Sequence, residues 1–146
     1  MTKNAEKTVL IAGASIITNK KNEILLVQEM PRKEYKEMGK KWNLPGGKQE
    51  PVESIEYCAK REGKEETGLD IKISSLVGKY EEDIPAHGIK IVMHVFKAEV
   101  VGGKIKRPAD IKDIKWFSIK EIENLNKKGL LLFKYVWKAI QDLSKA

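Results

Sequence analysis

The sequence is short of cysteine, of arginine and of long apolar segments, and each shortage excludes a class of protein. Cys58 is the single cysteine among 146 residues, so a framework of internal disulfides is excluded. No apolar run reaches the roughly 18 residues of a membrane span, and no signal-peptide core is present. These absences predict a soluble protein of the cytoplasm that does not interact with a membrane.

Arginine supplies only three of the 28 basic residues, so lysine carries most of the formal net charge of +7. A positive balance suits a polyanionic ligand, although a lysine-rich solvated surface has the same composition. The mixture of aromatic and basic residues that is typical of an RNA-binding module is missing. The composition therefore argues against nucleic acid as a partner and leaves a homodimer open.

The length is that of one ordinary domain, which can bury a substantial core without disulfides or metals as staples. No internal repeat, low-complexity block or linker divides the chain. We therefore expect a single domain over residues 1–146, with a polar and frayed segment at residues 1–7.

Hydrophobic periodicity predicts a chain of mixed strands and helices. The strands are expected at residues 9–18, 24–28, 71–80, 89–101 and 113–118, and the helices at residues 53–67, 119–125 and 130–143. Gly68 follows the first helix and is expected to end it. Because strands outnumber helices and their order is mixed, the pattern alone predicts an α+β protein.

The first predicted helix carries acidic residues where an apolar stripe should continue. At about 100° per residue, Ile55, Cys58 and Ala59 share one face of this helix. The same face, carried forward by one or two turns, meets Glu62, Glu65 and Glu66. Carboxylates that repel one another beside a core are costly unless a cation compensates them. The spacing therefore predicts a divalent metal site with oxygen ligands.

The segment from Gly47 to Leu69 resembles the signature of the Nudix hydrolase family, which is G-x(5)-E-x(7)-R-E-U-x-E-E-x-G-U with U a bulky aliphatic residue. The chain matches it with Gly47, Glu53, Arg61, Glu62, Glu65, Glu66, Gly68 and Leu69. One position departs, because Gly63 stands where the signature has an aliphatic side chain, which costs up to about 1 kcal/mol of helix stability. The resemblance implies an α/β/α sandwich with a central mixed sheet and a catalytic loop-helix-loop at its edge.

The same resemblance implies hydrolysis of a pyrophosphate bond with Mg²⁺ or Mn²⁺ as cofactor. The ion neutralises the phosphates and helps to activate a water molecule. Carried over to this chain, the metal ligands would be the carboxylates of Glu62, Glu65 and Glu66 together with the carbonyl group of Gly46. The general base varies within the family, and we favour Glu62.

Two further residues of the signature have supporting roles in this interpretation. Arg61 lies one turn before Glu65, where a pair four residues apart on a helix could orient that carboxylate. A helical wheel places Glu53 opposite the metal face. Gly46 and Gly47 permit a tight turn that aims backbone groups at the ligands.

The substrate is a nucleotide in this interpretation, and residues outside the signature are expected to select it. The loop at residues 31–41 can present Arg32 and Lys41 to phosphates, although its charges could equally be solvated surface. Pro85 lies 16 residues after Leu69, where ADP-ribose pyrophosphatases of the family carry a proline. Asp110 either joins the metal site, contacts the base or is a turn residue.

The likeliest substrates are ADP-ribose-like molecules or nucleoside triphosphates, including oxidised ones. Two alternatives stay open at this point. One is a Nudix module that binds nucleotide or RNA without turning it over, and the other is an enzyme that processes the 5′ end of RNA.

Overall fold

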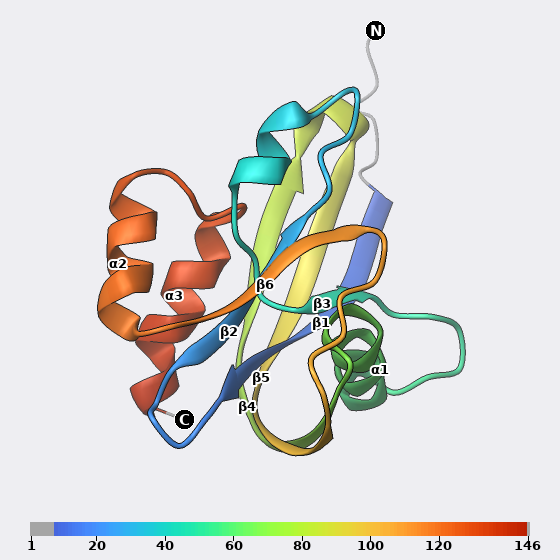
Figure 1. Ribbon diagram of the computed structural model, residues 1–146. Coiled ribbons are helices and arrows are strands. Elements are labelled where there is room, and N and C mark those ends of the chain that lie inside the picture. The colour runs from blue at the N-terminus through green and yellow to red at the C-terminus, as the bar shows by residue number, and fades with distance from the viewer. Residues whose placement is uncertain (1–7, 146) are drawn as a thin grey trace, which may run out of the picture.

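The computed structural model describes residues 8–145 of the chain, so the predicted frayed segment at residues 1–7 lies outside the described residues. In chain order the elements are β1 (Thr8–Thr18), β2 (Ile24–Glu29), η1 (Lys36–Lys40), β3 (Gly46–Lys48), α1 (Ile55–Thr67), β4 (Leu69–Ile84), η2 (Pro85–His87), β5 (Ile89–Gly103), β6 (Ile111–Phe117), α2 (Ile119–Lys127), α3 (Lys134–Asp142) and η3 (Leu143–Lys145), as Figure 1 shows. None of the described helices is long and apolar enough to cross a lipid bilayer.

A mixed sheet forms the centre of the fold. Its strand order is β4-β5-β1-β2-β6, and the short strand β3 pairs with β1 outside this path. β1 and β5 run parallel, whereas the other pairs are antiparallel. Helices α2 and α3 cover one face of the sheet and α1 covers part of the other (Figure 1). The predicted α+β sandwich with a central mixed sheet is confirmed.

Strand β1 is buried on both faces, as expected for the middle of a sheet that helices cover from both sides. Ala12, Ala14 and Ile16 belong to the core under α2 and α3. Gly13 faces the other way, and a side chain there would meet the backbone of α1, because a Cβ atom would lie 3.0 Å from the Ile55 carbonyl oxygen. α1 therefore rests directly on the backbone of β1.

Helix α1 begins later than the periodicity predicts. Ser54 is its N-cap, and the Ser54 hydroxyl oxygen accepts a hydrogen bond from the Tyr57 amide at 3.1 Å. Gly68 ends the helix in the left-handed conformation with φ of +83°, as predicted. Glu53 precedes the N-cap, so the helical wheel that places Glu53 opposite the metal face does not apply to it.

Several other predicted boundaries are wrong, and tertiary pairing explains three of them. α3 begins at Lys134 rather than 130 because the chain before it pairs with Trp42, whose carbonyl oxygen accepts from the Leu132 amide at 2.8 Å. β4 extends to Ile84 because β5 supplies partners along its whole length, with register shifts on the way. β6 begins at Ile111 because that residue pairs with the end of β2.

The departure at Gly63 from the aliphatic pattern has a packing reason. Gly63 is buried, and a Cβ atom there would lie 3.1 Å from the Cδ1 atom of Ile71 in β4. The Ile71 side chain therefore fills the space that an aliphatic side chain on α1 would take. Gly63 removes a side chain from the helix without leaving a hole.

We expect two substitutions at Gly63 to change the free energy of unfolding in opposite directions or by different amounts. Gly63→Ala gains up to about 1 kcal/mol of helix propensity and needs only a small shift of the Ile71 tip, so stability should be nearly unchanged or higher. Gly63→Leu should lower the free energy of unfolding by about 1–3 kcal/mol, because it overpacks the site. Urea unfolding measures both, and a Leu variant as stable as the original chain would contradict this packing.

Candidate active site

The carboxylate of Glu66 is partly buried at the junction of α1 and the glycine turn. Its Oε1 atom accepts a hydrogen bond from the Gly46 amide at 2.9 Å. Burial raises the pKa of Glu66 well above its ordinary value; the Gly46 hydrogen bond opposes this, and the negative charges of Glu62, Glu29 and Asp110 add to it. Several acids therefore converge on a position with little water to screen them.

Glu62 and Glu65 differ in exposure, although both were predicted to continue the apolar stripe. The side chain of Glu62 is 17% exposed and burial raises its pKa, whereas the side chain of Glu65 is 57% exposed. The buried positions of α1 are Cys58, Ala59, Gly63 and Thr67. The acids thus flank the buried stripe and do not lie within it, because Gly63 and Thr67 take the inward positions.

The turn before β3 brings its backbone against these acids. A Cβ atom on Gly47 would lie 2.5 Å from the Cδ atom of Glu62, and one on Gly46 would lie 2.5 Å from the Gly13 carbonyl oxygen. Only glycine fits at position 46, whereas a side chain at position 47 would displace the Glu62 carboxylate. The Cys58 thiol donates to the Gly47 carbonyl oxygen at 3.4 Å, and burial raises the pKa of this thiol to about 11. Cys58 is therefore a packing residue.

Arg61 joins the acids of α1 to the segment before the helix. Its Nε and Nη2 atoms donate to the two carboxylate oxygens of Glu53 at 2.9 and 2.7 Å. Its Nη1 atom donates to Glu62 Oε1 at 2.9 Å and lies 3.2 Å from Glu65 Oε2, while Nη2 also donates to the Lys48 carbonyl oxygen at 3.1 Å. The predicted pair with Glu65 is present, but Glu53 is the closest partner of Arg61.

The pair of Glu53 and Arg61 is a two-pronged contact between a planar guanidinium and a carboxylate. Hydrogen bonds from Arg61 lower the pKa of Glu53 to about 2. The side chains of Arg61 and Glu53 are 15% and 9% exposed. Arg61 therefore stays charged and fixed beside Glu62 and Glu65.

Glu29 belongs to the same group of acids, and the sequence analysis missed it. It ends β2, burial raises its pKa, and Arg32 lowers this pKa while Asp110 raises it. The Met30 amide donates to the Asp110 carbonyl oxygen at 3.0 Å, which ties the end of β2 to the start of β6. An acid at the end of a strand whose first four residues are apolar was the signal that could have found it.

Hard oxygen donors of this kind suit a divalent cation such as Mg²⁺. The burial that raises the pKa values of Glu62 and Glu66 is the cost that a cation would offset. Within residues 8–145, no three His, Cys, Asp or Glu side chains are arranged in this conformation so that they could hold a metal ion together. Glu62 and Glu65 share the Arg61 guanidinium in this arrangement.

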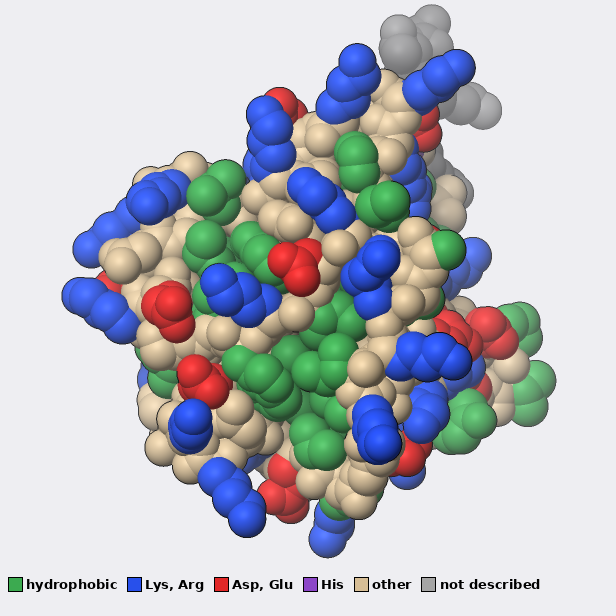
Figure 2. All heavy atoms as spheres, in the orientation of Figure 1, with side chains coloured by type: hydrophobic (Ala, Val, Ile, Leu, Met, Phe, Trp, Pro, Cys, Tyr) green, Lys and Arg blue, Asp and Glu red, His purple; other side chains and the backbone are tan. Residues whose placement is uncertain are grey.

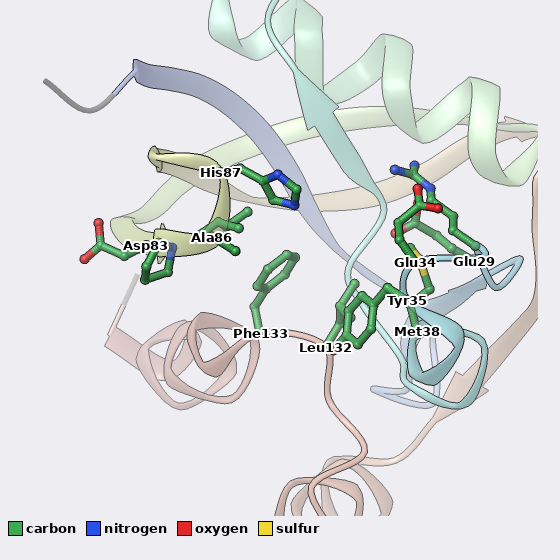
Figure 3. A pocket seen from close by; sticks show the side chains of 12 residues that line it. Glu29, Glu34, Tyr35, Met38, Asp83, Ala86, His87, Leu132 and Phe133 are labelled. Atoms are coloured by element: carbon green, nitrogen blue, oxygen red, sulfur yellow. The ribbon is translucent and has the colours of Figure 1, made fainter. Parts of the chain in front are cut away.

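A cavity of about 580 Å³ opens beside Glu29 (Figure 3). Figure 3 shows His87 of η2 across the cavity from Phe133, with Tyr35 beside Leu132. Its lining residues are Glu29, Arg32, Glu34, Tyr35, Met38, Asp83, Ile84, Pro85, Ala86, His87, Leu132 and Phe133.

The cavity brings together two of the residues that were predicted to bind substrate, Arg32 and Pro85. Lys41 is not in its lining, and its Nζ atom lies 3.4 Å from the Tyr35 hydroxyl oxygen. His87 and Phe133 line it without having been predicted. Phe133 lies in a segment that the periodicity predicted to be helical.

The burial of Glu66 predicts that its charge destabilises the metal-free protein. Glu66→Gln keeps an acceptor for the Gly46 amide and removes that charge, so at pH 8 with EDTA its urea midpoint should exceed that of the original chain. Because the folded pKa is raised, the penalty exists above that pKa, and the gain should disappear as the pH falls towards 4.5, the ordinary value for Glu.

Glu65→Gln is the matched control, since that side chain is mostly exposed and its substitution should change the urea midpoint little at either pH. Equal urea midpoints for Glu66→Gln and the original chain at pH 8 would show that the charged form of Glu66 does not destabilise the fold.

The chain matches the family model described as NUDIX domain over residues 8–135. It is 36% identical over 107 residues to the 8-oxo-dGDP phosphatase NUDT18 of Danio rerio, which covers 73% of this chain and 30% of that protein. It is 38% identical over 112 residues to the ADP-ribose pyrophosphatase of Methanocaldococcus jannaschii, which covers 75% of this chain and 62% of that protein. The chain thus spans less than two thirds of either relative.

Among solved structures, a NUDIX hydrolase from Nitrosomonas europaea superposes with a TM-score of 0.80 at 30% sequence identity. The match covers 94% of this chain and 90% of that one. The family model matches most of the chain, and the chain therefore belongs to the Nudix family.

Proposed function

We propose that the chain hydrolyses a pyrophosphate bond in a nucleoside diphosphate derivative, with Mg²⁺ or Mn²⁺ as cofactor and the cytoplasm as its place of action. The observation that carries this proposal is the convergence of carboxylates at the glycine turn, where the charges of Glu62, Glu29 and Asp110 act on the partly buried Glu66. Such a group is costly in a protein that binds no cation.

Four groups of the chain would hold the ion, namely the carboxylates of Glu62, Glu65 and Glu66 and the carbonyl group of Gly46. When bound, the ion would withdraw charge from the phosphates and lower the pKa of a coordinated water molecule. Glu62 is placed to accept the proton of the attacking water, because burial raises its pKa above the ordinary value and makes it a better base. Arg61 acts by positioning, since its donors hold Glu62 and Glu65.

The cavity beside Glu29 is the place we propose for the nucleoside or the group linked to it. Tyr35 and Phe133 offer apolar ring faces, Arg32 offers charge for a phosphate, and Pro85 lies in the same wall. The two relatives act on ADP-ribose and 8-oxo-dGDP by their names. Both ADP-ribose-like molecules and oxidised nucleoside phosphates therefore remain substrate candidates.

A Nudix module that binds nucleotide without turnover is the competing function. A binding module has no need of a buried carboxylate such as Glu66, whereas a hydrolase uses it. Screening the chain with Mg²⁺ against ADP-ribose, canonical and oxidised nucleoside triphosphates, dinucleoside polyphosphates and capped RNA separates the two.

Hydrolysis should require a divalent cation and stop on chelation. Glu66→Gln should lower kcat by at least about 100-fold, because ligand and base roles are each worth that much. The measurement is release of phosphate or pyrophosphate with Mg²⁺, with EDTA, and after Mg²⁺ is restored. Full activity in EDTA would exclude the proposed mechanism.

Arg61→Lys should lower kcat and leave KM nearly unchanged. Lysine keeps the charge but cannot form the fork to Glu53 while also reaching Glu62, so the acids lose their alignment. Steady-state kinetics with the best substrate of the screen measures both constants. A raised KM at unchanged kcat would place Arg61 on the substrate instead.

A further inference from the structure

A basic hollow of about 530 Å³ lies at the C-terminal end of α1, outside the acids described above. We use this name for the space lined by Lys64, Lys104, Lys106 and Arg107, with Glu65 at one side. Its cations come from two places in the chain, the last turn of α1 and the loop that joins β5 to β6 (Figure 1).

Close contact between two backbones makes the floor of the hollow. Gly68 and Gly103 have φ of +83° and +79°, and a Cβ atom on either would lie within 2.5 Å of a carbonyl oxygen of the opposite segment. The Lys106 amide also donates to the Thr67 carbonyl oxygen at 2.8 Å. Neither glycine has room for a side chain at this contact, and Lys104 and Lys106 line the hollow beside it.

Two of the four cations have no internal partner. Lys64 Nζ lies 3.1 Å from Asp70 Oδ1, and Arg107 Nη1 donates to the Ile111 carbonyl oxygen at 2.6 Å. Within the described part of the chain, no hydrogen bond or ion pair engages the side-chain ammonium groups of Lys104 and Lys106. Like charges beside a concave surface concentrate positive potential and attract an anion.

The hollow is continuous with the candidate active site. Glu65 lines the hollow and also contacts Arg61 at 3.2 Å. The loop that carries Lys104 and Lys106 runs on to Asp110, whose charge acts on Glu66 and Glu29. Figure 2 shows Lys and Arg side chains gathered along this loop. Glu29 in turn lines the larger cavity. The group of acids therefore lies between the larger cavity and the basic hollow.

We propose that the basic hollow is a subsite for the terminal phosphates of a nucleoside triphosphate or longer polyphosphate. The inference rests on the proposed function for the bond that is broken. With the nucleoside in the cavity and the scissile bond at the acids, the phosphates that leave would lie on the side of Lys104 and Lys106. ADP-ribose has one phosphate next to the scissile bond on that side, followed by a ribose, so it has no terminal phosphate to place in the hollow.

The first test is binding of inorganic tripolyphosphate to the full chain in EDTA, measured by calorimetry. Lys104→Gln/Lys106→Gln should weaken binding about tenfold, which corresponds to about 1.4 kcal/mol, and added salt should weaken it further. Lys127→Gln/Lys128→Gln at the end of α2 removes the same charge from another exposed place and should leave the affinity unchanged. Equal affinity of both double variants and the original chain would overturn the proposal.

The second test compares substrates. In Lys104→Gln/Lys106→Gln, kcat/KM should fall about tenfold for a nucleoside triphosphate and stay unchanged for ADP-ribose. An equal fall in kcat/KM for both substrates would overturn the proposal of a subsite for terminal phosphates. If the original chain hydrolyses neither substrate, the proposed function fails, while a loss of tripolyphosphate binding confined to this variant still supports the subsite.

Nucleic acid is the competing ligand for a basic hollow. An oligonucleotide without a terminal polyphosphate should bind the original chain more weakly than tripolyphosphate does at the same salt concentration. If it binds as tightly and loses the same factor in Lys104→Gln/Lys106→Gln, the hollow takes a nucleic-acid backbone, and the proposal for terminal phosphates is overturned.

Discussion

The structure depends on a carboxylate, that of Glu66, which is partly buried and close to other acids. Glu66 is held by one hydrogen bond, from the Gly46 amide at 2.9 Å, and Glu62, Glu29 and Asp110 add negative charge around it. This is an unfavourable arrangement for folding, because a buried charge needs compensation. The turn lies close to both β1 and α1, because glycine at position 46 lets it approach the Gly13 carbonyl oxygen and glycine at position 47 leaves room for the Glu62 carboxylate.

Arg61 explains how the acids keep a fixed geometry without a cation in place. Its guanidinium is anchored by Glu53 on one side, and from there it reaches Glu62 and Glu65. Removal of Glu53 would therefore act on the acids chiefly through Arg61, beside the direct effect of its charge on Glu62, which makes Glu53 a positioning residue. The same contact keeps Glu53 ionised, because it lowers the pKa of that carboxyl to about 2.

The sequence predicted well those features that depend on local chemistry. The end of α1 at Gly68 and the pairing of Arg61 with Glu65 each depend on residues close together in the sequence, and the structure contains both. The features that the sequence did not predict depend on contacts between residues far apart in the chain. Residues 130–132 read as helical by periodicity, but pairing with Trp42 keeps them extended.

The same distinction applies to the candidate site. The wheel placed Glu65 on a buried face, but Gly63 and Thr67 occupy the inward positions and leave Glu65 exposed. Glu29 lies 33 or more residues from the acids of α1 in the sequence, and only the sheet brings it near Glu66. Single-residue spacing could not show this proximity, nor could it show that Arg32 and Pro85 share one cavity.

The central claim is that Glu66 carries a raised pKa which a divalent cation would lower. The most direct measurement is an NMR titration of the Glu66 side-chain carboxyl carbon, once with EDTA and once with saturating Mg²⁺. The account predicts a pKa well above the ordinary value of 4.5 in EDTA and one below 4.5 with Mg²⁺. A pKa that is the same in both conditions would contradict it.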